Sequence, residues 1–196
     1  MKTDQAIYTY LSTGPEAFRV LTGGLQLSGA YRFRSVTFKA LERRVDGVCE
    51  PHGHAGPNYL VEFQAQPSEA AWYNLLTKIG LLGEANPRAE VRGILIFVHE
   101  RDDPGRPPGI ASPEGPFRAV YLNRFLPELL AREPDNPYVA VFAPLVIERD
   151  EALKAQAPAL WQTIQSAPLT ASVRQYLLEI LESMGAKVRW VQGPRS

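Results

Sequence analysis

The sequence predicts an α/β protein in which helices flank a mixed β-sheet and further helices follow towards the C-terminus. Up to residue 99, segments with helical spacing of apolar residues and segments with strand-like alternation follow one another as helix, three strands, helix, strand. The stretch from Gly93 to Val98 has six residues without a polar side chain, which is typical of a strand buried on both faces. The 196 residues, 45% of them hydrophobic, suffice for a real core, and we expect a single domain over residues 1–196.

The N-terminal part predicts two helices and three strands. "TDQAIYTYL" predicts a helix capped by Thr3 or Asp4, and "PEAFRVLTGG" predicts a second one from Pro15 to Gly23. "YRFRSVTFKAL" alternates as a strand does, and "RRVDGVC" and "NYLVEFQA" predict two more strands. Because short links join these three strands, we expect them to pair antiparallel.

The next part predicts a helix that crosses over to a fourth strand. "SEAAWYNLLTKIGLLG" predicts a helix capped by Ser68, with an apolar stripe that ends before Gly83. "VRGILIFVHE" then predicts a strand inside the sheet, and the helix before it favours parallel pairing with the third strand. The proline- and glycine-rich stretch "DDPGRPPGIASPEGP", residues 102–116, predicts a long surface loop or flap.

The C-terminal part predicts two strands and two helices. "FRAVYLN" and "YVAVFAPLVI" are typical of strands, and helices are expected over residues 149–166 and from Thr170 to Met184. We therefore expect a core of about residues 1–147 and a helical extension of about residues 148–196.

Composition excludes some classes of protein. The 21 basic residues balance the 21 acidic ones, so no overall charge attracts nucleic acid or a membrane. Cys49 is the only cysteine, which excludes an intrachain disulfide and a thiol-rich metal site, and we expect it to be a small core residue. The sequence lacks 18 consecutive apolar residues and the pattern of a secretory signal, and we expect a cytoplasmic protein without a membrane partner.

Two polar residues interrupt the third predicted strand. Strand alternation places Leu60, Glu62 and Gln64 on one face, and the apolar residues between them on the other. A carboxylate on a partly covered face is costly unless a cation or hydrogen bonds compensate it. If Asp46 lies on the neighbouring strand, the two carboxylates need a positive charge between them.

A divalent metal ion would supply that charge. Mg²⁺ (or Mn²⁺) prefers oxygen ligands and often binds one or two carboxylates together with substrate phosphates. The hypothesis is that Asp46 and Glu62 are the anionic ligands, that the backbone carbonyl of Phe63 adds a neutral one, and that Gln64 orients a water molecule or a phosphate oxygen.

Simpler interpretations stay open. Asp46 and Gly47 could form a hairpin turn, and Glu62 could be a structural carboxylate paired with an arginine. The Trp72/Tyr73 pair suits core packing, with base stacking as the alternative. A zinc site is a further alternative, with candidate ligands Glu50, His52 and His54.

Basic residues gather around the first two strands and are interleaved with Tyr31 and Phe33. They suit a local patch that faces phosphates, with a solvated strand face as the alternative. The candidate nucleic-acid-binding residues are Arg32, Arg34, Lys39, Arg43 and Arg44.

The motifs in these elements resemble the PD-(D/E)xK phosphodiesterase superfamily. "RRVDGV" and "VEFQ" match the variant with glutamine in place of the lysine, within the same order of elements. "KTDQAIYTYL", "YRFRSVTFK", "RRVDGV" and "YLVEFQ" resemble more closely a bacterial, largely cyanobacterial, group related to the Rpn-type recombination-promoting nucleases, also described as transposase-related. The similarity covers roughly residues 1–147.

The resemblance implies a restriction-endonuclease-like fold and a metal-dependent DNA endonuclease. Asp46 and Glu62 match metal ligands, Gln64 matches the lysine position, and Asp4 matches an acidic position that assists the metal or caps the helix. Thr37 stands where the group related to the Rpn-type nucleases tends to have an acidic residue. Asn74 stands near a position where that group tends to have an arginine. These departures leave a second expectation open, a nucleic-acid-binding or interaction domain that has lost catalysis. A homodimer would suit an enzyme that cuts both strands of DNA.

Overall fold

The computed structural model describes residues 3–38, 43–64, 66–110, 115–147 and 149–185, and it gives only the backbone of 3–5, 35–38, 43–46 and 109. The chain forms two compact units, one that extends to Leu122 and one that begins at Asn123. The first unit thus ends before the limit of about residue 147 that we expected for the core.

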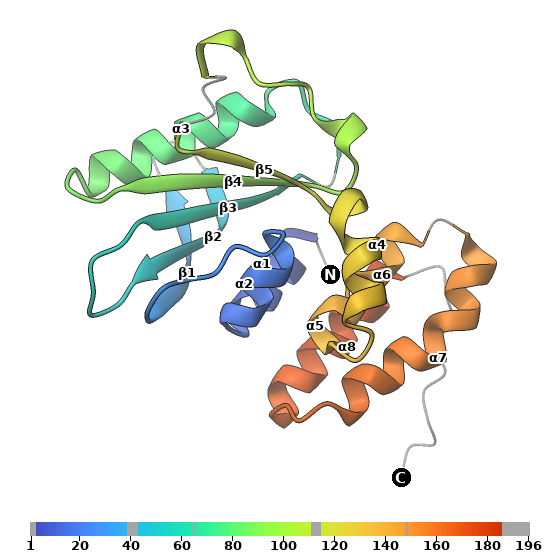
Figure 1. Ribbon diagram of the computed structural model, residues 1–196. Coiled ribbons are helices and arrows are strands. Elements are labelled where there is room, and N and C mark those ends of the chain that lie inside the picture. Colours follow the sequence, from blue (N-terminus) through green and yellow to red (C-terminus); the bar gives the residue numbers. More distant parts are fainter. Residues whose placement is uncertain (1–2, 39–42, 65, 111–114, 148, 186–196) are drawn as a thin grey trace. The chain divides into compact units, whose positions relative to one another are not determined.

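The first unit is a five-stranded mixed sheet with helices on both faces (Figure 1). The strands lie in the order of the sequence; the first three pair antiparallel, and the third, fourth and fifth pair parallel. The elements are α1 (Thr3–Ser12), α2 (Pro15–Leu21), β1 (Tyr31–Phe38), β2 (Arg43–Pro51), β3 (Asn58–Gln64), α3 (Ala71–Ala85), β4 (Val91–Phe97) and β5 (Phe117–Tyr121). This confirms the predicted α/β class, the order of elements and the change from antiparallel to parallel pairing.

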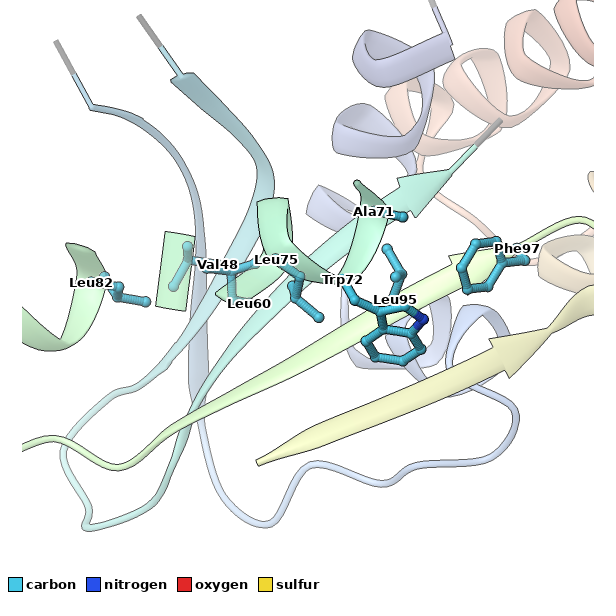
Figure 2. Close-up of a cluster of buried hydrophobic side chains, with 8 residues drawn as sticks. All are labelled: Val48, Leu60, Ala71, Trp72, Leu75, Leu82, Leu95 and Phe97. Atoms are coloured by element: carbon cyan, nitrogen blue, oxygen red, sulfur yellow. The ribbon is translucent and has the colours of Figure 1, made fainter. Parts of the chain in front are cut away.

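The helix α3 covers one face of the sheet and forms a core with β2, β3 and β4 (Figure 2). Its apolar stripe includes Trp72, Leu75 and Leu82, which pack with Leu60 of β3 and with buried residues of the neighbouring strands. Gly93 of β4 permits this close packing, because a Cβ atom there would lie 2.5 Å from Cδ1 of Ile79. The helices α1 and α2 lie on the opposite face of the sheet (Figure 1).

The helix α3 differs from the prediction at both ends. It begins at Ala71, and its N-cap residue is Ala70 without a side-chain hydrogen bond, so Ser68 is not the cap. The backbone carbonyl of Ser68 instead accepts a hydrogen bond from the amide of Ala71. The helix passes through Gly83 to Ala85, because a single glycine costs a helix only about 1 kcal/mol.

The dipeptide Asp46-Gly47 lies within β2, so its interpretation as a hairpin turn is wrong. Gly47 pairs with Val61 of β3. A Cβ atom at Gly47 would lie 1.9 Å from Cζ of Phe33, whose ring packs at 5.6 Å from that of Tyr8 in α1. Glycine at this position therefore makes room for an aromatic ring from the neighbouring strand.

The segment between β4 and β5 contains two short 3-10 helices, η2 (Glu100–Asp102) and η3 (Pro108–Ile110). The carboxylate of Asp103 attaches this segment to the sheet and α3. It accepts hydrogen bonds from the indole N–H of Trp72 at 2.8 Å, from the hydroxyl of Tyr121 at 2.6 Å and from the amide of Gly105 at 2.8 Å. The guanidinium of Arg106 lies 5.0 Å from the centre of the Trp72 ring.

The second unit is helical. The structure describes α4 (Leu122–Arg132), α5 (Pro137–Ala140), α6 (Ala143–Val146), α7 (Asp150–Ser166) and α8 (Ala171–Met184). The predictions of α7 and α8 are confirmed, and the Thr170 hydroxyl caps α8 by accepting a hydrogen bond from the amide of Val173. Most of α4 was not predicted from the sequence, although Leu122, Leu126 and Leu129 are buried at helical spacing.

The predicted strand "YVAVFAPLVI" is wrong, because α5 and α6 occupy this segment. Asn136 caps α5 by accepting a hydrogen bond from the amide of Tyr138 at 2.9 Å, and Pro137 occupies the first turn. The residues from Val139 to Ala143 are all buried. A short run of buried apolar residues has the same appearance in a strand and in a helix, so its periodicity did not distinguish them.

Candidate functional site

The strand β3 directs Glu62 and Gln64 to the face that α3 covers, as the alternation predicted. Two residues before Glu62, Leu60 belongs to the core beneath α3. Further along, Glu62 and Gln64 line a cavity of about 260 Å³ together with residues of α3 and β4. Its other lining residues are Ala71, Asn74, Leu75, Lys78 and Leu95.

An ion pair between β3 and α3 lies in this cavity. The ammonium Nζ of Lys78 donates a hydrogen bond to Oε2 of Glu62 at 2.5 Å. The two side chains are only 13% and 14% exposed. Leu95, the parallel partner of Glu62 on β4, is an apolar neighbour of the carboxylate, so little water remains to solvate its charge. The Lys78 ammonium supplies the compensating positive charge.

Lys78 was not among the site residues predicted from the sequence. The sequence does contain a signal, because Asn74 and Lys78 are four residues apart on α3 and therefore lie on one side of the helix, next to the stripe with Leu75. Both line the cavity. The group related to the Rpn-type nucleases, which this chain resembles, tends to have an arginine near the position of Asn74. In this chain the positive charge is Lys78, one turn further along α3. The open interpretation of Glu62 as half of an ion pair is thus correct, with a lysine in place of an arginine.

Asp46 lies on β2 as predicted, next to the strand that contains Glu62. It directly precedes Gly47, which pairs with Val61, and Glu62 directly follows Val61 on the antiparallel neighbour. Each of the two predicted metal ligands is thus the chain neighbour of one member of the pair Gly47 and Val61. The side chain of Asp46 lies outside the described residues, and so does that of Asp4 in α1.

The other two predicted site residues are on β3. Phe63 pairs with Ile96 of β4, and its ring is buried. The side-chain amide of Gln64, the last residue of β3, donates a hydrogen bond to the backbone carbonyl of Gln66. Gln64 therefore lies in the cavity with Glu62 but brings no charge.

The donor chemistry of the cavity fits a hard divalent cation. Glu62 offers carboxylate oxygens and Gln64 and Asn74 offer amide oxygens, which are ligand types that Mg²⁺ accepts. The ammonium of Lys78 occupies a cation position against Glu62. Among the side chains that the structure describes, no group of three or more His, Cys, Asp or Glu residues could hold a metal ion. A complete ligand set would have to include Asp46.

The predicted basic patch is only partly described. The guanidinium of Arg34 donates hydrogen bonds to both carboxylate oxygens of Glu50, at 2.7 and 2.5 Å, and this contact raises the pKa of Arg34. The positive charge of Arg34 is thus paired with the carboxylate of Glu50. Arg32 is exposed, and a guanidinium nitrogen of Arg32 lies 3.4 Å from Nδ1 of His52. Thr37 pairs with Arg44 between β1 and β2, where only the backbone is described. Arg43 is the first residue of β2, and only its backbone is described. Lys39 lies outside the described residues.

The structure does not support the zinc alternative. Glu50 binds Arg34, His52 contacts Arg32, and the ring nitrogens of His54 lie 2.8 and 2.9 Å from the carbonyls of Ala30 and Ala55. The three candidate ligands therefore have separate partners and form no common site.

Two further interpretations are settled by burial. Cys49 is 3% exposed, and burial raises the pKa of its thiol well above the ordinary value, so it is an inert core residue as expected. Trp72 is also buried, at 1% exposure, which excludes it from stacking on bases. Tyr73 points to solvent with 56% exposure, so core packing was correct for only one member of this pair.

The comparisons with known proteins give a family. Residues 3–187 match the family model described as "Protein of unknown function (DUF2887)". No curated protein matches the chain, and no solved structure does. The resemblance to the PD-(D/E)xK superfamily therefore stays a prediction from the sequence. Within the described ranges, none of the helices combines the length and the apolar composition that crossing a bilayer requires.

Proposed function

The chain belongs to the DUF2887 family, and we propose that it is a metal-dependent endonuclease that hydrolyses phosphodiester bonds in DNA. The observation that carries the proposal is the Glu62 carboxylate, which is 14% exposed and lines one cavity together with the amide side chains of Gln64 and Asn74, so that several oxygen ligands suited to a divalent cation border the same space. The position of Asp46 on the neighbouring strand supports a shared metal site.

Each residue of the proposed site has a distinct role. Glu62 and Asp46 would hold Mg²⁺ or Mn²⁺ through their carboxylates, and the backbone carbonyl of Phe63 would add a neutral oxygen. When bound, the metal lowers the pKa of a water molecule and stabilises negative charge on the phosphate. Gln64 orients the water or a phosphate oxygen through its amide, since an amide cannot accept a proton as a general base.

The DNA backbone is the proposed partner of the basic residues on β1 and β2. Arg32 is exposed and available for a phosphate, whereas Arg34 must first leave Glu50. Lys39, Arg43 and Arg44 are the other proposed phosphate-binding residues, and Arg43 and Arg44 lie in β2, the strand that contains Asp46.

Nicking of supercoiled plasmid in Mg²⁺ or Mn²⁺ tests the proposal. We expect the wild type to nick and the isosteric variants Asp46→Asn and Glu62→Gln to be inactive while still folded. Glu90→Gln is the matched control, because Glu90 is an exposed carboxylate paired with Arg92 away from this cavity, and it should nick like the wild type. Equal nicking by all four proteins would reject the assigned site.

A second candidate function is a nucleic-acid-binding domain that keeps the fold without catalysis. The Lys78–Glu62 pair favours it, because Lys78 already neutralises the carboxylate without a metal ion. For this function we expect metal-independent binding of a labelled DNA duplex and no nicking in either metal ion.

We also propose a homodimer in the cytoplasm. Two copies related by a two-fold axis would present two sites to the two strands of DNA. Light scattering after size exclusion should give twice the mass of 21.8 kDa, and a mass of one chain would reject the dimer.

A further inference from the structure

The ion pair between Lys78 and Glu62 places a cation of the protein where the proposed function requires a metal ion. The distance of 2.5 Å between Nζ and Oε2 leaves no room for another cation between these two atoms. Both side chains are nearly buried, so solvent screens little of the repulsion between an ammonium group and a divalent cation. Lys78 and a metal ion bound to Glu62 therefore compete for the same carboxylate.

The ammonium group of Lys78 has a second possible position within the same cavity. Its ammonium is carried on a flexible four-carbon chain, and the cavity of about 260 Å³ extends from Glu62 to Asn74 on α3 and Gln64 at the end of β3. A phosphate at a metal ion on Glu62 would lie in this cavity. An ammonium displaced from Glu62 would there find an anion to replace the carboxylate that it lost.

We propose that Lys78 exchanges Glu62 for a DNA phosphate when a divalent metal ion binds, so that metal and DNA bind cooperatively. The inference rests on the proposed function for the presence of the metal ion, and it adds a residue and a coupling that the sequence motifs do not contain. Without a metal ion, the pair keeps Lys78 away from DNA. Coupling of this kind is reciprocal: whatever weakens the pair strengthens metal binding, and the metal ion strengthens DNA binding through Lys78.

Calorimetric titration with MnCl₂ tests the competition. We expect Lys78→Met to bind Mn²⁺ at least about tenfold more tightly than the wild type, because the ammonium group that competes with the metal ion for Glu62 is removed. Lys154→Met removes an exposed lysine of α7 and should bind like the wild type. Equal Mn²⁺ affinity in all three proteins would overturn the inference, even if the wild type nicks plasmid.

The salt dependence of DNA binding tests the second half of the exchange. In Mn²⁺, the slope of log affinity against log salt should be shallower by about one in Lys78→Met than in the wild type, because one phosphate contact is missing. In EDTA the two slopes should agree, since Lys78 is then held by Glu62. A lysine with a merely structural role would give equal slopes under both conditions, which would overturn the proposal.

A measurement on the wild type covers the case in which Lys78→Met does not fold. Acetylation of Lys78 by an amine-reactive reagent, followed by mass spectrometry, should be slow in EDTA, faster in Mn²⁺ and slow again when DNA is added. Rates that do not respond to Mn²⁺ would refute the exchange.

The proposed function can fail separately. Wild-type protein that shows the expected acetylation and salt slopes but does not nick plasmid would keep the exchange and reject the nuclease. Absence of Mn²⁺ binding in every variant would reject both.

Discussion

Replacing Asp103 with alanine is expected to lower the free energy of unfolding by about 2–4 kcal/mol. Its carboxylate accepts hydrogen bonds from Trp72, Tyr121 and Gly105. The three donors do not count equally. Trp72 is 1% exposed, so its indole N–H would be left without a partner, at a cost of about 1–3 kcal/mol. Tyr121 is half-buried and adds about 1 kcal/mol, whereas the exposed amide of Gly105 can bind water.

Two variants separate this hydrogen bonding from other effects of the substitution. Asp103→Asn keeps one oxygen acceptor, and it should lose about half as much stability as the alanine variant. Asp102→Ala removes the neighbouring carboxylate and leaves the three donors in place, so it should change stability by less than about 0.5 kcal/mol.

Urea denaturation followed by far-ultraviolet circular dichroism and tryptophan fluorescence gives the comparison. The midpoint should shift while the slope with denaturant stays constant, because the surface exposed on unfolding is unchanged. Wild-type stability in Asp103→Ala, or an equal loss in Asp102→Ala, would show that the carboxylate does not attach the segment between β4 and β5.

Three further predictions follow from single contacts. Gly47→Ala should lose about 1–3 kcal/mol of stability because its Cβ atom meets the ring of Phe33, and much less in a Phe33→Ala background; equal losses in both backgrounds would exclude the clash. Burial, and next the hydrogen bond to Asp103, raises the pKa of Tyr121 from 10.0 to about 12. The neutral phenol is thus favoured in the folded state, so the contribution of Tyr121 to stability should be fully present below pH 10.0 and be lost as pH rises towards 12. Urea titrations at each pH should show a smaller fall over this range in Tyr121→Phe than in the wild type. Cys49 should react with a thiol reagent only as fast as the protein unfolds, and immediate reaction of the native protein would contradict its burial.

The sheet unit was predictable because its signals are local. The alternation in β3 and the apolar stripe of α3 are each contained in one short segment, and both patterns were interpreted correctly. The antiparallel and parallel pairings followed from the length of the links between strands. Residues 138–147 show where this reasoning fails, since a run of buried apolar residues carries no period and the cap at Asn136 decides for a helix.

By itself, the sequence determined that Glu62 and Gln64 share one face of a strand, because alternation depends on near neighbours in the chain. It left open whether Asp46 lies on the neighbouring strand or in a turn, and the structure places it in β2. Only the tertiary structure decided which charges meet. Lys78 pairs with Glu62 because α3 packs on the sheet. Arg34 of the predicted basic patch forms an ion pair with Glu50 of the neighbouring strand. Each pair joins residues 16 positions apart, and its geometry depends on how whole elements pack. No local pattern specifies that packing, so the partner of the candidate site's carboxylate became visible only in the folded chain.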